Sequence, residues 1–206
     1  MNDVHANFQS RIKDFIVYCR GKLPEYDQLL TGNVIFKERT KGLGILTKEE
    51  AISYGVTGPS GRASGFACDV RKLKPYSAYD RVQFKEILHT EGDTFFRYKC
   101  RIEEMYESLY ILEQLVDNIP EGNFAVKMKP IMKLPVGEYF QSVETARGEL
   151  GVYVISDGNK SPYRIKFRTP NFSNLFVINK LAAGNKIADL VAISGSLDLV
   201  IPDIDR

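Results

Sequence analysis

Few residues of this 206-residue chain have the type and spacing that catalysis or metal binding requires. The three cysteines, Cys19, Cys68 and Cys100, lie far apart, and no Cys-x-x-Cys pair occurs. Zinc and iron–sulfur centres need clustered thiolates, so we expect no metal site within the chain. The two histidines, His5 and His89, lack the partner motifs of catalytic centres. A self-contained active site is therefore not expected.

These residues also have simpler structural interpretations. Cys19 and Cys100 fall on apolar faces of predicted helices, where a free cysteine acts as a small core residue. Cys68 lies in a glycine-rich loop, and nothing nearby in the sequence clearly lowers its pKa. We expect His89 at the surface. The odd number and wide spread of the cysteines argue against a disulfide framework and fit a reducing compartment.

Other common functional motifs are absent as well. The sequence contains neither a G-x-x-x-x-G-K-[ST] phosphate loop nor a G-x-S-x-G nucleophile elbow. A formal net charge of +2 gives no global field for nucleic-acid binding. No apolar run approaches the roughly 20 residues that span a bilayer. The polar start has neither a signal-peptide nor a transit-peptide pattern. We expect a protein on the cytoplasmic side, bacterial rather than organellar, that binds no nucleic acid.

The helices that would position functional groups are predicted from apolar spacing. Residues 7–31 predict a helix in two pieces, because Gly21 and Pro24 interrupt the pattern. The clearest helix spans about 93–118 and carries one apolar stripe. Residues 55–79 are rich in glycine, proline and serine and predict a long loop.

A capping box and a β section complete the predicted elements. Thr47 and Glu50 have the capping-box spacing for a short helix that ends at Ser53. Strands and then short helices are predicted at 138–145, 149–156, 162–168, 172–183 and 185–193. The last residues are predicted to be extended. The expected fold is α+β: one domain over residues 1–206, with a helical core around one long central helix, then a small antiparallel β section and short C-terminal helices.

Four sequence blocks resemble a known family, the quinone-site subunit of respiratory complex I, which is also called the D or 49-kDa-type subunit. This family is related to the large subunits of nickel–iron hydrogenases. The order and spacing of the blocks agree with the C-terminal portion of the 49-kDa-type subunit, and the family's N-terminal half is expected to be absent here. The blocks span Leu23–Thr40, Gly55–Tyr79, Val143–Arg168 and Lys186–Arg206.

The last block separates the two related families. Hydrogenase large subunits carry Cys-x-x-Cys after the corresponding aspartate, and those thiolates hold nickel and iron. This chain has Asp198-Leu199-Val200-Ile201-Pro202-Asp203 at that place. The missing sulfurs exclude a hydrogenase-type centre and favour the family from complex I.

The resemblance implies a role beside a quinone. The 49-kDa-type subunit helps to form the chamber in which quinone is reduced, next to the terminal iron–sulfur cluster held by a neighbouring subunit. By residue match, Asp198, Val200, Arg206 and Arg147 fall at this interface between cluster and quinone. A cation there would stabilise negative charge that develops during reduction, and Asp198 could pair with it. Arg62, in the glycine-rich loop, is expected either to order that loop or to contact a neighbouring subunit.

The chain also departs from the family. The headgroup ligands of the family, a histidine and a tyrosine, belong to the missing half. Phe95 and Phe96 stand where the family often has Tyr-Asp. Only a short stretch at 123–135 replaces a longer helical segment. Proton-coupled roles of those segments are therefore not expected here.

The resemblance predicts the partners and leaves an alternative. The chain would bind no cofactor itself and would be inactive alone, within a membrane-associated NADH:quinone oxidoreductase. Its partners would be the other peripheral-arm subunits, including the iron–sulfur subunit, B, and its neighbour C, the membrane arm through the complex, and quinone. The alternative is a redox-inactive truncated paralogue that acts as an interaction or assembly module. The basic positions at Arg164, Lys166 and Arg168 are expected to form a solvated strand face or an intersubunit contact.

Overall fold

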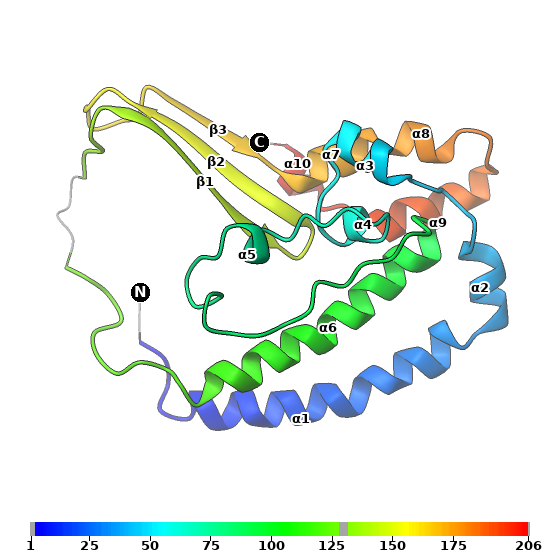
Figure 1. Cartoon of the computed structure of the whole chain (residues 1–206), viewed down its shortest axis with the longest axis horizontal. Helices are drawn as coiled ribbons and strands as arrows, with labels where there is room; N and C mark the ends of the chain where they lie inside the picture. Colours follow the sequence, from blue (N-terminus) through cyan, green and yellow to red (C-terminus); the bar gives the residue numbers. More distant parts are fainter. Residues whose placement is uncertain (1–2, 128–131, 206) are drawn as a thin grey trace.

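The computed structural model of the chain describes residues 3–127 and 132–205. The strands form one antiparallel sheet in the order β1-β2-β3, and helices precede and follow it (Figure 1). This arrangement confirms the predicted α+β class. The strands are β1 (Gly137–Thr145), β2 (Gly148–Ser156) and β3 (Arg164–Arg168). The helices are α1 (Phe8–Tyr26), the π-helical η1 (Asp27–Thr31), α2 (Val34–Thr40), α3 (Lys48–Tyr54), α4 (Gly58–Arg62), α5 (Val70–Leu73), α6 (Thr94–Val116), α7 (Pro170–Phe176), α8 (Ile178–Ala182), α9 (Ile187–Leu197) and α10 (Ile201–Ile204).

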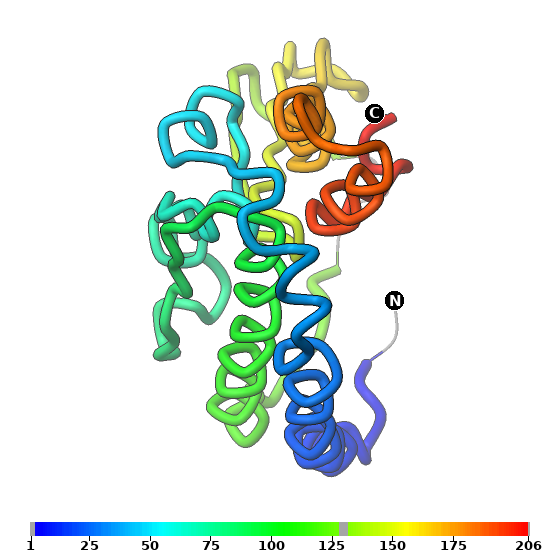
Figure 2. Tube along the Cα trace, turned by 90° about the vertical axis from the view of Figure 1, so that its right-hand side faces the viewer, coloured from blue at the N-terminus to red at the C-terminus, as the bar shows by residue number. Residues whose placement is uncertain are grey.

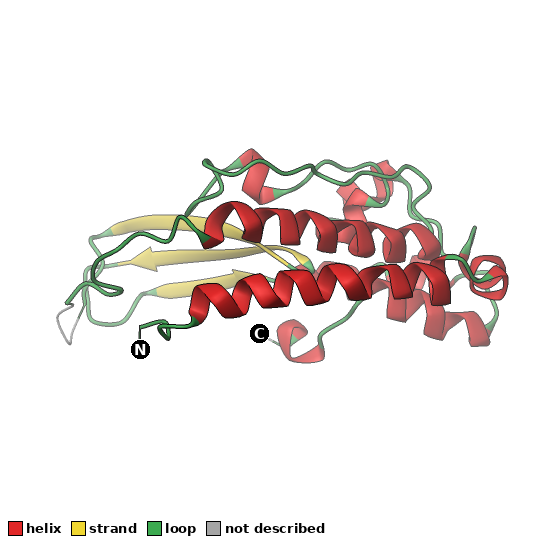
Figure 3. Cartoon of the chain, turned by 90° about the horizontal axis from the view of Figure 1, so that it is seen from below, coloured by secondary structure: helices red, strands yellow, loops and turns green. Residues whose placement is uncertain are grey.

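The two long helices, α1 and α6, lie side by side (Figures 2 and 3). Ile16 and Leu23 of α1 pack against Leu109 of α6, and all three are buried. Each such side chain contributes roughly 1.5–3 kcal/mol relative to an exposed one. The predicted break at Gly21 and Pro24 is wrong, because α1 continues through both residues. Packing of the neighbouring Leu23 outweighs the weak local helix preference.

A second apolar core joins α3, α8 and α9. It contains Leu46, Ala51, Val56, Val177, Leu181, Ile193 and Leu197. The predicted capping box of α3 is confirmed: Thr47 Oγ1 accepts from the Glu50 backbone N–H, and Glu50 Oε2 accepts from the Thr47 backbone N–H. The C-terminal helices that share this core carry the tail, so the core fixes where the tail lies.

The segment predicted as a long loop contains two short helices, α4 and α5. Asp69 caps α5 by accepting from the Arg71 backbone N–H. Helices of five and four residues are too short to show an apolar period, which is why the sequence predicted only a loop here.

The tight turn of the β1–β2 hairpin is held against the start of α4. A Cβ added at Gly58, which has φ +69°, would lie 2.4 Å from the Arg147 carbonyl oxygen. A Cβ added at Gly148 would lie 2.5 Å from Thr57 Oγ1. Two glycines are therefore required for this approach. Thr57 Oγ1 also accepts from the Glu149 backbone N–H at 3.0 Å.

Arg168 at the end of β3 strengthens the same junction. Its guanidinium donates to the Gly55 and Glu149 carbonyls, each at 2.6 Å. Arg168 is therefore not part of a solvated face as predicted, whereas Arg164 and Lys166 are exposed. Turn residues 145–148 are thus fixed from two sides.

The tail is not extended as predicted. Helix α9 ends at Leu197, Asp198 follows in the left-handed conformation, and α10 forms after Val200. Pro202 in the first turn of α10 suits a helix start, because its fixed φ matches that of the helix. The two predicted helical stretches at 172–183 and 185–193 correspond to α7, α8 and α9, with a break at Val177.

Large apolar side chains remain exposed on several elements. Ile187 and Val191 on α9 are 90% and 77% exposed, and Tyr163 beside the sheet is 75% exposed. Within residues 3–127 and 132–205, no helix combines the length and apolar character needed to cross a bilayer.

Candidate functional site

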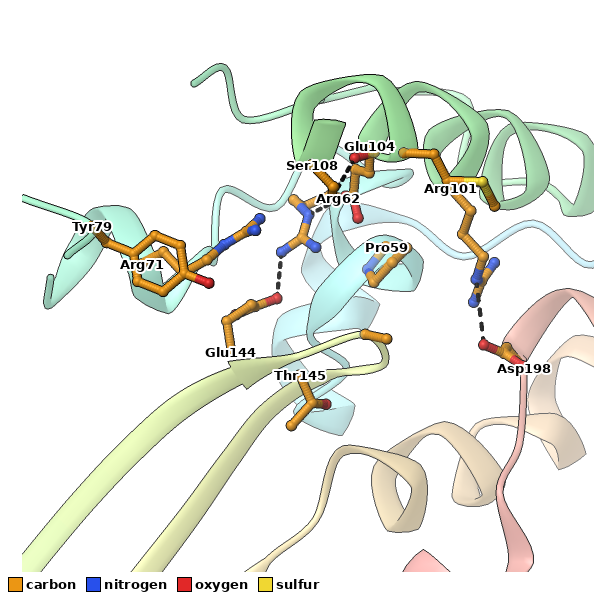
Figure 4. Close-up of a pocket in the computed structure, with 12 residues that line it drawn as sticks. Pro59, Arg62, Arg71, Tyr79, Arg101, Glu104, Ser108, Glu144, Thr145 and Asp198 are labelled. Atoms are coloured by element: carbon orange, nitrogen blue, oxygen red, sulfur yellow. Dashed lines mark hydrogen bonds and ion pairs between the residues drawn. The ribbon is translucent and has the colours of Figure 1, made fainter. Parts of the chain in front are cut away.

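Four parts of the chain surround a cavity of about 400 Å³. They are helix α6, the α4–α5 segment, the β1–β2 turn and the residue that follows α9 (Figure 4). Half of the residues that line the cavity are charged (Arg62, Arg71, Arg101, Glu104, Glu144 and Asp198), and Pro59 is among the others. Elements that are distant in sequence therefore bring ionisable groups to one place.

Asp198 is held in an uncommon backbone conformation at one end of this cavity. Its φ and ψ are both 54°, in the left-handed region that few residues other than glycine adopt. Aspartate and asparagine tolerate this conformation better than most residues. The preceding core residue Leu197 is fully buried and anchors the end of α9. The side chain of Asp198 is therefore presented from a fixed point.

Arg147 and Arg101 both face the Asp198 carboxylate. Arg147 Nη2 donates to Asp198 Oδ1 at 3.3 Å, and Arg147 Nε lies 3.0 Å from Oδ2 as an ion pair without hydrogen-bond geometry. Arg101 Nε lies 4.0 Å from Oδ2, at the limit of an ion pair. The pairing of Asp198 with a cation that the sequence suggested is thus present, and a second cation joins it.

Two arginines one turn apart on α6 support this end of the cavity. Arg101 Nη1 donates to the Arg97 carbonyl at 2.9 Å. Arg97 itself is fully buried and donates only to neutral acceptors: the Gly44 and Gly92 carbonyls and two hydroxyl groups. Burial lowers the pKa of both arginines, for Arg97 to about 9. Arg97 therefore remains cationic at pH 7.

Arg62 occupies the other end of the cavity. Its Nε donates to Glu104 Oε1 at 2.6 Å and its Nη1 donates to Glu144 Oε1 at 2.8 Å (Figure 4). The side chains of Arg62 and Glu144 are 2% and 3% exposed. Burial raises the pKa of Glu144 although Arg62 opposes the shift. Glu144 Oε2 also accepts from the Val70 backbone N–H, which ties β1 to α5.

The structure places the Arg62 side chain inside the chain. It is buried and paired with two carboxylates of this chain, which ties the glycine-rich loop to α6 and β1. The expected contact of this loop with a neighbouring subunit stays a prediction.

Of the remaining predicted site residues, Val200 is partly buried and stands at the start of α10, outside the cavity wall. Arg206 lies outside the described residues.

The residues of α6 that complete the site were not predicted from the sequence. Arg97, Arg101 and Glu104 recur at intervals of four and three residues, so they share one face of the helix. This polar face beside the apolar stripe could have indicated the site. Charged side chains on a helix face that packs inside a protein need partners, because an unpaired buried charge is costly.

The isolated cysteines and the histidine have structural roles. Cys68 is buried, and burial raises its pKa to about 12. The Cys100 thiol is buried and donates to Glu104 Oε1 at 3.3 Å. His89 is partly buried beside Glu103 rather than fully at the surface as expected, with Nε2 2.8 Å from Oε2. In the part of the chain that the structure describes, no group of three or more potential ligands could hold a metal.

Comparison with known proteins agrees with the resemblance found in the sequence. The family model described as "Respiratory-chain NADH dehydrogenase, 49 Kd subunit" matches residues 1–133 and 126–206. The C/D subunit of the NADH-quinone oxidoreductase of Bacteroides fragilis is 54% identical over 204 residues, which are 99% of this chain and 38% of that relative. The D subunit of the enzyme from Geobacillus thermodenitrificans is 46% identical over 204 residues, 98% of this chain and 56% of that relative.

A third relative, the D subunit of the NADH-quinone oxidoreductase of Desulforamulus reducens, is 44% identical over 203 residues, 98% of this chain and 56% of that relative. The chain thus spans about two fifths of the C/D relative from Bacteroides and a little over half of the two D relatives. Since the family model covers the chain from end to end, the chain belongs to the family of the 49-kDa subunit of respiratory-chain NADH dehydrogenase.

Proposed function

We propose that the chain works within an NADH:quinone oxidoreductase as one wall of the chamber in which quinone is reduced. Residues 1–206 would form one domain that corresponds to the C-terminal part of the 49-kDa-type subunit. Family membership and the names of the relatives support the proposal. The strongest support within this chain is the group formed by Asp198, Arg147 and Arg101. Quinone reduction places negative charge on the headgroup, and the arginines of this group would stabilise that charge.

The geometry suits this chemistry. A guanidinium that faces a low-dielectric cavity stabilises a developing anion more strongly than it would in water. Asp198 would fix the direction in which Arg147 presents its N–H groups, and it would act as a positioning residue. Val200 and Arg206 would flank the same interface, as the family resemblance implies.

The electrons would come from an iron–sulfur cluster held by a neighbouring subunit. This chain would bind no cofactor and would be inactive alone. Its partners would be the other subunits of the peripheral arm, B and C among them, and the membrane arm through the complex. The chain would be peripheral, on the cytoplasmic side of the cell membrane. The exposed apolar side chains on α9 and on the sheet offer surface for these contacts.

A second candidate is an interaction or assembly module without a redox role. The observation that favours it is the exposed apolar surface of α9, where Ile187 and Val191 are 90% and 77% exposed. In that case the Asp198 group would be inherited but unused, and quinone reduction would proceed without it.

Asp198→Asn in the assembled oxidoreductase tests the proposal. Asparagine keeps the left-handed backbone and the size of the side chain but removes the charge. We expect quinone reductase activity to fall about tenfold with normal assembly. Arg164→Gln, a charge change on the exposed strand, is the matched control and should leave activity unchanged. Unaltered turnover and quinone affinity in Asp198→Asn would reject the site, and unaltered activity without the chain would favour the assembly module.

A further inference from the structure

The Asp198 end of the cavity contains more positive than negative charge. Arg101 and Arg147 share the single carboxylate of Asp198. Arg97, one helical turn away, has no hydrogen bond to a carboxylate among the described residues. Buried or half-buried cations are costly unless an anion compensates them. Asp93 acts electrostatically on Arg97, but the guanidinium groups of Arg101 and Arg147 share one carboxylate and leave a demand for negative charge.

Hydrogen-bond donors remain free at the same place. Within the described part of the chain, Arg101 Nε is buried and has no hydrogen-bond partner, and Arg147 Nε has an ion-pair contact but no hydrogen bond. The other two nitrogens of Arg101 are used by the Arg97 carbonyl and by Ser60 Oγ. Arg101 and Asp198 both line the cavity, so a ligand inside it lies against the Arg101 side chain.

The carboxylates at the far end do not cancel this demand. Glu104 and Glu144 are both bonded to Arg62, and Pro59 lies between that group and Arg101 in Figure 4. The carboxylates at this end therefore face Arg62 and Arg71, whereas two arginines share one carboxylate around Asp198. The size of the cavity, about 400 Å³, suits a small molecule or a single side chain.

We propose that this cavity binds a small oxyanion of the carboxylate or phosphate class, with Arg101 of the cavity wall as one ligand and Arg147, which pairs with the same Asp198 carboxylate, as a second ligand beside it. The planar guanidinium groups match two oxygens of such an anion. Asp198 competes with the bound anion for the same donors and so limits its affinity. The anion could be free in solution or belong to a partner's acidic side chain. The site uses the same Asp198 group as the proposed quinone wall, but its affinity for an anion is measured without quinone.

The two possible roles of the Asp198 group predict opposite effects of one substitution. If the arginines serve only to hold Asp198, removing the charge of Asp198 creates no binding site, and the affinity of the chain for anions does not rise. If they form an anion site, removing the competing carboxylate strengthens anion binding. Asp198→Asn therefore separates the two roles even if substitutions of arginine disturb folding.

The test is a titration of the full 206-residue chain with acetate and, separately, with phosphate, followed by NMR at constant ionic strength maintained with chloride. We expect saturable shifts, about tenfold weaker binding in Arg101→Gln and in Arg147→Gln, and about tenfold tighter binding in Asp198→Asn. Arg164→Gln should bind like the unaltered chain. Acetate binding alone would indicate a carboxylate ligand, and phosphate binding alone a phosphate ligand.

Three outcomes would overturn the inference: no saturable binding up to roughly 100 mM, equal affinity in Arg101→Gln and the unaltered chain, or weaker binding in Asp198→Asn. Because the titration needs neither quinone nor partner subunits, its failure would not affect the proposed quinone function. Loss of quinone reduction in Asp198→Asn with tighter anion binding would support both.

Discussion

The two ends of the central cavity use the same residue types in opposite ratios. At one end a single cation, Arg62, lies between two carboxylates, and its side chain is 2% exposed. At the other end a single carboxylate, Asp198, lies between two arginines and is 40% exposed. One group is complete within the chain and sealed. The other is open and unbalanced.

This difference indicates separate purposes. A group whose charges are already paired within the chain gains little from a ligand, so its contribution is to hold the loop, α6 and β1 together. An open group with excess positive charge gains from an added anion, whether that is a bound oxyanion or the charge on a reduced headgroup. Substitutions test this difference. Those at the Arg62 end should lower the stability of the chain, and those at the Asp198 end should change its binding of anions.

Arg62→Ala should give the largest effect. It leaves Glu104 and Glu144 without their shared cation in a buried place, and we expect a loss of about 3–5 kcal/mol in the free energy of unfolding. Urea unfolding followed by circular dichroism measures it. The matched substitution at the other end, Arg101→Ala, should cost at most about 1 kcal/mol. Similar costs at both ends would contradict the distinction between a sealed and an open group.

Thiol labelling tests whether the Arg62 end is closed. Cys100 donates to Glu104 and is buried, and Cys68 is buried in the same loop region, whereas Cys19 is only partly buried. Burial raises the pKa of both inner thiols, which leaves little reactive thiolate. A thiol reagent should modify Cys19 at least about 100-fold faster than the other two in the native chain.

Cys19→Ser should then react only slowly until denaturant is added. Equal rates for the three thiols in the native chain would mean that the Arg62 end opens readily.

The long helix and the hairpin could be predicted from the sequence because their patterns repeat over many residues. Helices α4, α5 and α10 could not, since four or five residues show no period. The continuous course of α1 through Pro24 depends on packing of Leu23 against α6, which no local pattern contains.

The site residues also divide into those that the sequence predicted and those that it did not. Asp198 and Arg147 were found through the family resemblance, but the partners of Arg62 were not. Glu104 and Glu144 are 42 and 82 residues away in sequence, and only the fold brings them together. The left-handed conformation of Asp198 depends on where α9 ends against the core, which the tail sequence alone does not reveal.

Glu144→Gln should change how stability depends on pH. Burial raises the pKa of Glu144 above its ordinary value of 4.5, so the folded chain holds this proton more tightly than the unfolded chain. The stability from Glu144 is therefore fully present below pH 4.5 and is lost as pH rises through the folded-state pKa. Relative to Glu144→Gln, the unaltered chain should become less stable over that window in urea unfolding at several pH values. A constant difference would contradict the prediction.

The smallest expected effect concerns the backbone at Asp198. With φ and ψ at 54°, glycine is unstrained here, whereas alanine has no side-chain hydrogen bond to offset the left-handed conformation. Asp198→Ala should therefore be about 1 kcal/mol less stable than Asp198→Gly, with Asp198→Asn between them. Both Ala and Gly remove the same partly exposed ion pair, so their difference in urea unfolding isolates the backbone. Equal stabilities would show that the chain leaves this conformation easily. A difference of about 1 kcal/mol would mean that Asn, rather than Ala, is the substitution that tests the charge of Asp198 without disturbing where the tail presents it.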